Sequence, residues 1–596
     1  MRWGLSPRDS TLWITIYGAP LARRFLFSAT LTTMEEKIKQ AIQKALAEAG
    51  AGDVTFVVER SREAGHGDYA TNAAMAAAKV VGKSPREVAD DLARILGSST
   101  SLGPTSIAAI EVAGPGFINI TLSREQVALA VAEAGAQGSE WGRTSELSEK
   151  RVIVDYANPN PFKEMHIGHL MSAIIGEALV RLRRSRGAEV FGSSFGGDVG
   201  PHVAKALWGL QKAGITDIVS AKEIGEAYAR GSSAYETDEV VKNEIDALNV
   251  RLYNVVARAD DATLSADDRT LLALWQKGRE ISMQEFKRIF AIFGTKLDFD
   301  FFDSDTIEGG MRVVHDGVGK GIFEESDGAI IYRGEKVGLH TLVFITSRGT
   351  PTYETKDVGL AFLKEERFPS DESIVVTSVE QIGHFKVLLA ALKEIAPKIA
   401  EKTVHVPHGF LKLTSGKMSS REGNVITAAD FIRDIIEKAS ERNEDPLIAE
   451  QVAIGAIKYM VLRQSPGSDI IFDPEKSLSL EGDSGPYLQY ALVRAKKILA
   501  YADNGAGGTA EPAEPYLIER IILHYPEVVA RAARELAPNI LTTYLTELAS
   551  AWNSFYASEQ ILGSPEEAYK QRVARAFATT MTNGLALLGI PAPERM

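Results

Sequence analysis

The run His166-Ile167-Gly168-His169 stands where a predicted buried strand over 151–157 gives way to a predicted helix. The N-terminus of a helix presents unpaired N–H groups and a partial positive charge, so it suits a phosphate group. Gly168 has no side chain, which lets a nucleotide approach the backbone closely. The two imidazoles can both donate to a triphosphate as negative charge develops during a displacement. A pair of surface histidines, or of hydrogen-bonded core histidines, would give the same pattern.

A second group with chemical potential lies far along the chain, at Lys417-Met418-Ser419-Ser420. A loop that carries a lysine and two hydroxyls can fold over phosphates and neutralise a departing pyrophosphate. Taken alone, the same residues also describe a turn with a solvated lysine. The histidine motif comes first, the lysine motif follows, and a helical segment comes last. This combination is more specific than either motif by itself.

The elements that must position these motifs follow from the hydrophobic pattern. Strand and helix patterns alternate over 150–480, which predicts a parallel, doubly wound sheet. Within it, residues from about 205 to 293 are mostly helical and are expected to form an insertion. Residues 34–142 form a compact α/β unit, and 481–596 are helical throughout. The fold class is therefore α/β: a Rossmann-like parallel-sheet catalytic domain, a small N-terminal α/β domain and a C-terminal all-α helical bundle.

The amino-acid composition excludes several classes of protein and of functional site. The chain has 596 residues, a formal net charge of −13 and no cysteine. The lack of cysteine excludes disulfide frameworks, thiol nucleophiles, cysteine-bound zinc and iron–sulfur clusters, and it fits a reducing compartment. The net negative charge does not indicate a nucleic-acid partner. It does not exclude one either, because a binding surface depends on the charges near it and not on the net charge of the whole chain.

Residues 1–33 differ from the rest, with Arg2, Arg8, Arg23 and Arg24 set against a single acidic residue and no lysine. An Arg-rich, acid-poor start is typical of an organelle transit peptide. The alternative is that Met34 is the true start and that an over-extended reading frame precedes it. We favour the alternative, because the segment shows neither clean amphipathicity nor a clear cleavage site. Its apolar runs are too short to span a membrane.

The order of the two motifs, with a helical domain after them, resembles a class I aminoacyl-tRNA synthetase. Four further runs stand outside these motifs: GDYATN at 67–72, GPGFIN at 114–119, SGPYLQYA at 484–491 and GIPAPERM at 589–596. With them the chain, from about Met34 to Met596, resembles the arginyl-tRNA synthetase family.

The resemblance implies an arginine–tRNA ligase. Arginine and ATP would give arginyl-adenylate and pyrophosphate, and the arginyl group would pass to the 3′-terminal adenosine of tRNA(Arg). The implied cofactor is ATP with Mg²⁺ carried by its phosphates, without zinc or any other metal site. The N-terminal domain would contact the tRNA elbow and the helical domain the anticodon. A cytoplasmic monomer without a membrane partner, whose first step needs bound tRNA, is also implied.

The same resemblance assigns roles to individual residues. The expected catalytic residues are His166, His169 and Lys417. The expected ATP-binding residues are His166, Gly168, His169, Asp198, His384, Lys417, Met418, Ser419, Ser420 and Lys163. A guanidinium is planar, charged and rich in donors, so its site needs carboxylates and amide or phenol acceptors. The expected arginine-binding residues are Asp155, Asn160, Tyr353, Asp357 and Gln381, with Asp357 as the guanidinium partner.

The chain departs from the family pattern in places. Many relatives have glutamate at Asp155, so the carboxylate here is one methylene shorter and its contact with substrate is expected to be less direct. Met171 stands where arginine is usual. Lysines occur at both Lys163 and Lys417, whereas some relatives have only the first. We expect Lys417 to be the main pyrophosphate contact and Lys163 a second one.

Three other functions remain open at this stage. Another class I synthetase would keep the phosphate motifs but would not need Tyr353, Asp357 and Gln381 together. A non-catalytic tRNA-binding paralogue would be expected to have lost a histidine or the lysine of the two motifs. A small nucleotidylyltransferase would have no use for the flanking domains. In the helical domain, Trp552 is expected in the core, while Phe555 and Tyr556 are candidates for stacking on bases.

Overall fold

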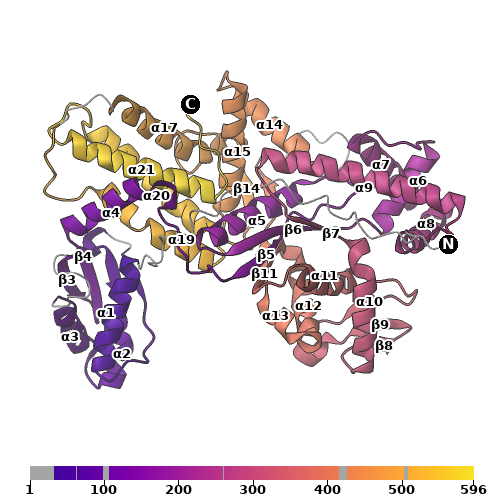
Figure 1. Cartoon of the computed structure of the whole chain (residues 1–596), viewed down its shortest axis with the longest axis horizontal. Helices are drawn as coiled ribbons and strands as arrows, with labels where there is room; N and C mark the ends of the chain where they lie inside the picture. The colour runs from indigo at the N-terminus through magenta and orange to yellow at the C-terminus, as the bar shows by residue number, and fades with distance from the viewer. Residues whose placement is uncertain (1–32, 62–63, 98–105, 260, 415–425, 503–507) are drawn as a thin grey trace, which may run out of the picture.

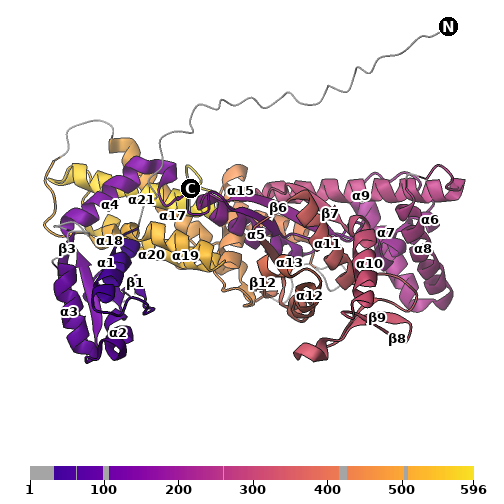
Figure 2. The same ribbon diagram turned by 60° about the horizontal axis from the view of Figure 1, so that its bottom comes forward.

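The structure is a computed structural model that describes residues 33–61, 64–97, 106–259, 261–414, 426–502 and 508–596. The molecule is elongated in both views (Figures 1 and 2). An N-terminal unit lies at one end, a helical insertion lies at the other, and a central sheet with the C-terminal helices lies between them. No helix among the described residues is long and apolar enough to cross a membrane.

The centre of the molecule is a five-stranded sheet in the order β12-β11-β5-β6-β7, with every neighbouring pair parallel. The order runs outward from β5 in both directions, so β5 and β11 flank the switch point at which ligands bind in such sheets. This confirms the expected Rossmann-like parallel sheet. The strands are β5 (Arg151–Asp155), β6 (Glu189–Gly196), β7 (Phe299–Phe302), β11 (Glu372–Ser378) and β12 (Thr403–His408).

Helix α5 (Ile167–Ser185) follows β5 and packs against the sheet through a largely buried apolar surface. Gly176 in this helix lies against Tyr156, where an added Cβ would stand 2.2 Å from the ring, so only glycine fits. The other helices of this part are α10 (Asp303–Gly319), α11 (Tyr353–Arg367), α12 (Ile382–Ile395), α13 (Pro397–Lys402), α14 (Ala428–Ser440), α15 (Pro446–Leu462) and α16 (Pro474–Ser477).

Two small sheets accompany the central one. An antiparallel sheet packs with α10 and α12 and consists of β8 (Glu324–Ser326), β9 (Ala329–Tyr332) and β10 (Leu342–Ile345). A parallel pair is formed by β13 (Leu411–Leu413) and β14 (Ile470–Phe472). Between β6 and β7 stand four helices around a core of their own: α6 (Pro201–Lys212), α7 (Ala221–Thr237), α8 (Glu239–Ala257) and α9 (Ala266–Ile292).

The N-terminal unit has a separate apolar core beneath an antiparallel sheet in the order β1-β2-β4-β3. Its strands are β1 (Val58–Arg60), β2 (Tyr69–Thr71), β3 (Ile107–Ala113) and β4 (Phe117–Leu122), and its helices are α1 (Met34–Glu48), α2 (Ala73–Val81), α3 (Pro85–Gly97) and α4 (Arg124–Gln137). The C-terminal part is helical, as expected, with α17 (Gly485–Ala502), α18 (Leu517–Leu523), α19 (Tyr525–Arg534), α20 (Pro538–Ser558) and α21 (Glu567–Leu587).

The N-terminal unit is docked on the C-terminal helices by a polar network. Arg520 donates to the buried Asp68 at 2.6 Å, and the buried Tyr69 hydroxyl donates to Glu527 at 2.8 Å. Glu527 also accepts from the backbone N–H of Glu35 at 2.9 Å. Asp68 and Tyr69 belong to the run at 67–72, so these side chains of that run face another domain of the same chain.

Trp552 on α20 is fully buried and stacks on Phe577 of α21, with ring centroids 4.5 Å apart and planes 7° apart. We predict that Trp552→Ala lowers the free energy of unfolding by about 3–5 kcal/mol, because the lost ring leaves a cavity. Tyr556→Ala on the same helix is the matched control. Tyr556 is 36% exposed, and its ring contacts Arg494 by a cation–π interaction, worth about 1 kcal/mol or less. Urea unfolding followed by circular dichroism compares the two variants, and equal losses would contradict the packing role of Trp552.

Candidate active site

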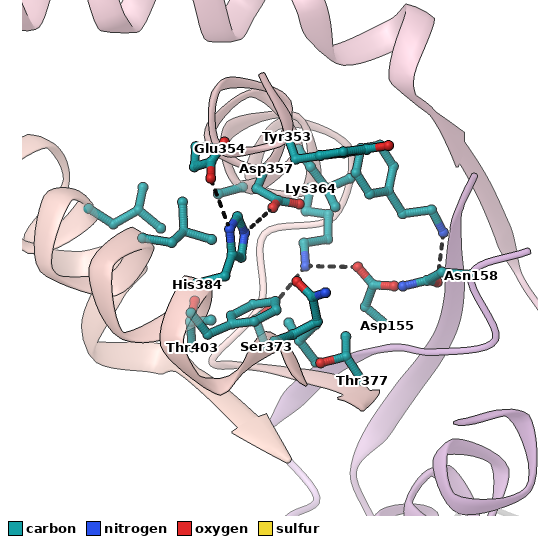
Figure 3. A pocket seen from close by; sticks show the side chains of 18 of the residues that line it. Asp155, Asn158, Tyr353, Glu354, Asp357, Lys364, Ser373, Thr377, His384 and Thr403 are labelled. Carbon is teal, nitrogen blue, oxygen red and sulfur yellow. Dashed lines mark hydrogen bonds and ion pairs between the residues drawn. The ribbon is translucent and has the colours of Figure 1, made fainter. Parts of the chain in front are cut away.

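A cavity of about 570 Å³ lies at the carboxyl ends of β5 and β11, between the sheet and helices α11 and α12 (Figure 3). Among the residues that line it are all five that were expected to bind arginine: Asp155, Asn160, Tyr353, Asp357 and Gln381. They come from three separate segments of the chain. The fold therefore brings together side chains that are up to about 230 residues apart in sequence.

Asp155 ends β5 and is almost completely buried. Lys364 of α11 approaches it, with 3.5 Å between the ammonium nitrogen and Oδ2, and the same ammonium donates to Ser373 of β11 at 3.3 Å. Burial raises the pKa of Asp155, and the positive charge of Lys364 opposes this effect. The carboxylate thus already has an internal cation beside it.

The loop after β5 is strained and is held by its own polar side chains. Ala157 and Phe162 both adopt left-handed backbone conformations, with φ of 61° and 66°, which non-glycine residues rarely adopt. Between them, the side-chain oxygens of Asn158 and Asn160 accept from the backbone N–H groups of Phe195 (2.9 Å) and Gly197 (2.8 Å). These bonds fix the loop to the end of β6 and hold Asn160 at the cavity.

Helix α11 presents acidic side chains to the cavity from its first two turns. Glu354 and Asp357 lie one turn apart, and both face His384 of α12. The ring nitrogen Nε2 of His384 is 2.6 Å from Asp357, and Nδ1 is 3.4 Å from Glu354. Tyr353, which begins the helix, is 69% exposed, and its ring lies across the top of the cavity (Figure 3). A planar cation can thus meet carboxylates on one side and an aromatic face on the other.

The histidine motif begins α5, as expected, and His166 is the N-cap residue. Its Nδ1 accepts from the N–H of Gly168 at 3.1 Å, which leaves the proton of a neutral ring on Nε2. The rings of His166 and His169 are 3.7 Å apart between centroids. Desolvation and nearby positive charge lower the pKa of both imidazoles, most strongly that of His169. Both rings are therefore neutral donors near pH 7.

The histidine motif also contacts the chain that follows the lysine motif. His166 and Thr427 form an antiparallel bridge, Ala428 N–H donates to the carbonyl of Met165 at 2.8 Å, and Ile167 N–H donates to the carbonyl of Ile426. Lys417, Met418, Ser419 and Ser420 themselves lie outside the described residues. The segment that carries them ends at 425, directly before residues that touch the histidine motif.

Known proteins resemble this chain over nearly its whole length. A family model described as the catalytic domain of tRNA synthetases class I (R) matches residues 131–474. The arginine–tRNA ligase of Treponema denticola is 30% identical over 561 residues, covering 87% of this chain and 91% of that protein. The chain belongs to the class I arginyl-tRNA synthetases. It is accordingly an ATP-dependent arginine–tRNA ligase.

Further comparisons agree with this assignment. Models of the arginyl-tRNA synthetase N-terminal domain and of the DALR anticodon-binding domain match residues 33–122 and 488–596. The arginine–tRNA ligase of Streptococcus thermophilus is 30% identical, covering 94% of this chain and all of that protein. The structure of the Thermus thermophilus arginyl-tRNA synthetase superposes with a TM-score of 0.77 at 25% identity, covering 94% of this chain and 100% of that one.

Two of the residues expected to bind ATP in this synthetase already have partners within the protein. Asp198 is fully buried: it accepts from the backbone N–H and hydroxyl of Ser304, at 2.9 and 2.7 Å, and from Arg279 at 3.0 Å. These contacts hold the start of α10, and the expectation that Asp198 contacts ATP stays a prediction. His384 lines the cavity of the arginine-binding candidates, in contact with the carboxylates of Asp357 and Glu354.

Lys163 lies near the histidine motif but outside the main cavity. Its ammonium stands 5.0 Å from the ring centroid of Tyr228 in the helical insertion. It lines a second cavity of about 280 Å³ together with Thr427. Lys163 is thus on the side of the motif where the lysine loop rejoins the described chain. No group of three or more histidine or acidic residues arranged to hold a metal ion occurs in the described parts of the chain.

Sequence reasoning missed several charged residues of the cavity. Glu354 and Lys364 stand three residues before and seven after Asp357, so helical spacing places them on the same face of α11. This helical spacing could have predicted from the sequence that Glu354 and Lys364 lie near Asp357. The buried pair of Lys356 and Asp303, 2.6 Å apart, gave no such indication, because its partners come from two helices. Asp303 lines the same cavity, and burial raises its pKa to about 6.

Proposed function

We propose that the cavity at β5 and β11 binds arginine, with its guanidinium at Asp357 and the ring of Tyr353. The observation that carries this proposal is the convergence of Asp155, Tyr353, Asp357 and Gln381 on one cavity at the switch point of the sheet. Asp357 is only partly buried, so its carboxylate can be reached by a ligand. Asn160 and Gln381 also line the cavity and supply amide groups that would bind the α-amino and carboxylate groups of arginine.

We further propose that ATP lies at the start of α5. The arginine carboxylate attacks the α-phosphorus, the bond to the bridging oxygen breaks, and pyrophosphate leaves. No side chain needs to form a covalent bond, so the protein contributes alignment and charge stabilisation. His166 and His169 each donate an N–H to phosphate oxygens as charge develops. Their neutral state supports this role, because a neutral imidazole has one N–H donor. In His166 the bond that Nδ1 accepts from the N–H of Gly168 leaves this donor on Nε2.

Lys417 is proposed as the main contact to the departing pyrophosphate. The contacts of 426–428 with the histidine motif support it, because they tether the end of the lysine segment beside the expected phosphates. Lys163 is proposed as a second contact, and Met418, Ser419 and Ser420 as further nucleotide contacts. ATP would bring Mg²⁺ on its phosphates.

The remaining domains are proposed to bind tRNA(Arg). Residues 34–142 would contact the elbow, residues 150–480 would hold the chemistry and residues 481–596 would bind the anticodon, in a monomer that acts in the cytoplasm. The docking of Asp68 and Tyr69 on α18 and α19 supports a fixed distance between the elbow-binding and anticodon-binding parts. In the second step the terminal 2′-hydroxyl of the tRNA attacks the mixed anhydride and releases AMP.

Charging of a mixed tRNA pool with each labelled amino acid tests this function. We expect arginine to be charged and lysine, glutamine and methionine to be rejected. Preferred charging of another amino acid would point to a different class I synthetase. Failure to charge any amino acid would point to a non-catalytic paralogue.

We predict that the activation step depends on bound tRNA(Arg). ATP–pyrophosphate exchange with arginine should be at background without tRNA and should rise at least about tenfold with it, as expected when binding assembles a catalytic site. The assay uses a tRNA whose 3′-terminal ribose is oxidised. This tRNA cannot accept the arginyl group, so transfer to tRNA does not contribute to the measured exchange. Equal exchange rates with and without tRNA would contradict the prediction.

A further inference from the structure

The imidazole of His384 bridges two carboxylates of the neighbouring helix. Glu354 and Asp357 lie three residues apart on α11, and each faces a different ring nitrogen of His384, at 3.4 and 2.6 Å (Figure 3). The three side chains line the cavity that is proposed to bind arginine. The carboxylate that is proposed to receive a guanidinium therefore already has a side chain of the protein beside it.

This bridge requires the charged form of the ring. A neutral imidazole has one N–H donor and one acceptor nitrogen, whereas an ionised carboxylate only accepts. Both contacts can be satisfied only when both nitrogens carry hydrogen. Burial alone would lower the pKa of His384, but the hydrogen bonds and charges of Asp357 and Glu354 outweigh it and raise the pKa to about 10.

The other groups around the ring do not remove this charge. His405 on β12 stacks on Phe385, and burial and the charge of His384 lower its pKa to about 4, so it is neutral. The ring of His340 lies near Gly383, the residue before His384. Among the described residues, Glu354 and Asp357 are the anions that contact His384.

We infer that His384, as an imidazolium, holds the guanidinium position at Asp357 in the empty enzyme, and that arginine displaces it with release of a proton. The inference rests on the proposed role of Asp357. Imidazolium and guanidinium are both planar, delocalised cations, and their N–H donors lie in the plane of the ring or of the guanidinium group. Arginine can thus take over the same carboxylate geometry.

Proton release follows from the charges. Two cations beside one carboxylate repel strongly in a partly buried site, so the pKa of His384 must fall when the guanidinium arrives. In the exchange, the arginine cation binds to the enzyme whose His384 is protonated. The products are the bound arginine cation, neutral His384 and one proton, which passes to the buffer. The proton is therefore a competitor of arginine.

The sign of the pH dependence is determined by this exchange. Raising the pH removes the competing proton, so the affinity for arginine should rise with pH. Between the pKa of His384 in the complex and its pKa of about 10 in the free enzyme, Kd should fall up to about tenfold per pH unit. His384 is a specificity-determining residue in this scheme, because only a ligand that satisfies Asp357 better than an imidazolium can enter.

Isothermal titration of arginine into the full-length enzyme tests the exchange. Titrations at pH 7.5 in buffers of different ionisation enthalpy count the protons released, and a series over pH 6.5–8.0 gives Kd. We expect the wild type to release about one proton and His384→Gln to release close to none. The α-amino group of arginine behaves alike in both, so the difference between them reports His384.

His405→Gln is the matched control, because this neighbouring histidine is neutral and contacts neither carboxylate. It should release as many protons as the wild type. The KM for arginine in the charging reaction over the same pH range is a second readout: it should fall with pH in the wild type and stay flat in His384→Gln.

Two outcomes would overturn the inference: arginine binding by the wild type without proton release, or equal release by His384→Gln and the wild type. The wild-type measurement needs no variant, so a misfolded variant would still leave a decisive result. If Asp357→Asn binds arginine normally, the proposed arginine site itself is wrong. If Asp357→Asn abolishes binding while the wild type releases no proton, only the role of His384 is wrong.

Discussion

Asp357→Asn should raise the KM for arginine about 100-fold, because it replaces the charged partner of a charged ligand by a neutral one. Removing one member of a close charge pair typically costs about 2–5 kcal/mol, and each 1.4 kcal/mol changes an equilibrium constant tenfold. The amide keeps the shape of the carboxylate, so the helix and cavity should persist. Steady-state charging of tRNA(Arg) at varied arginine concentration measures the effect.

The pattern of kinetic parameters separates binding from folding. We expect the KM for ATP to change little in Asp357→Asn, because the phosphates are proposed to lie at the start of α5, away from α11. Asp316→Asn, at an exposed position on α10, is the matched control and should behave like the wild type. A normal KM for arginine in Asp357→Asn would show that the guanidinium binds elsewhere.

His169→Ala should lower the rate of arginyl-adenylate formation by about 10²–10³, with a smaller effect on ATP binding. The loss of one preorganised donor to a developing negative charge typically has this size. Single-turnover formation of the adenylate, with tRNA(Arg) bound, measures the chemical step directly. His315→Ala, at an exposed position on α10, is the control for loss of an imidazole and should leave the rate unchanged.

The double variant His166→Ala/His169→Ala tests whether the two rings act as one unit. Their centroids are 3.7 Å apart, so they can serve the same phosphate group. If they do, the double loss will be smaller than the product of the single losses. A rate in His169→Ala within about twofold of the wild type would instead mean that the ring only packs against its neighbours.

Much of the site could be predicted from the sequence because its parts are local. The position of His166 at a helix start follows from a buried strand, a short loop and an apolar helical pattern. A histidine motif followed by a later lysine motif indicated a class I synthetase. The motifs of the arginyl-tRNA synthetase family then pointed to Asp155, Tyr353 and Asp357. All three line one cavity. Asp155 ends β5 and Gln381 follows β11, and these two converge because parallel strands end at the same edge of the sheet. Tyr353 and Asp357 lie on α11, which follows β10 of the small antiparallel sheet, so they reach the cavity only through the packing of that helix.

Other features needed three-dimensional contacts. Asp198 follows a strand and resembles a nucleotide contact, yet Ser304 and Arg279 engage its carboxylate in the interior. The side chains of Asp68 and Tyr69 turn toward α18 and α19. In each case the partner lies more than 80 residues away in the chain. No local sequence pattern shows which of several distant residues will contact the side chain.

The sequence by itself determined the class of fold, the phosphate motif at α5 and the set of side chains that define the arginine-binding candidates. The fold class and the helix start depend on periodicity and short motifs, which are properties of neighbouring residues. The arginine-binding candidates are what the resemblance to the family implies. Only the tertiary structure decided how the charges of the cavity are paired: Asp155 with Lys364, Asp303 with Lys356, and Asp357 with His384. Pairing depends on distances of a few ångströms between separate elements, and these distances exist only once the helices have packed on the sheet.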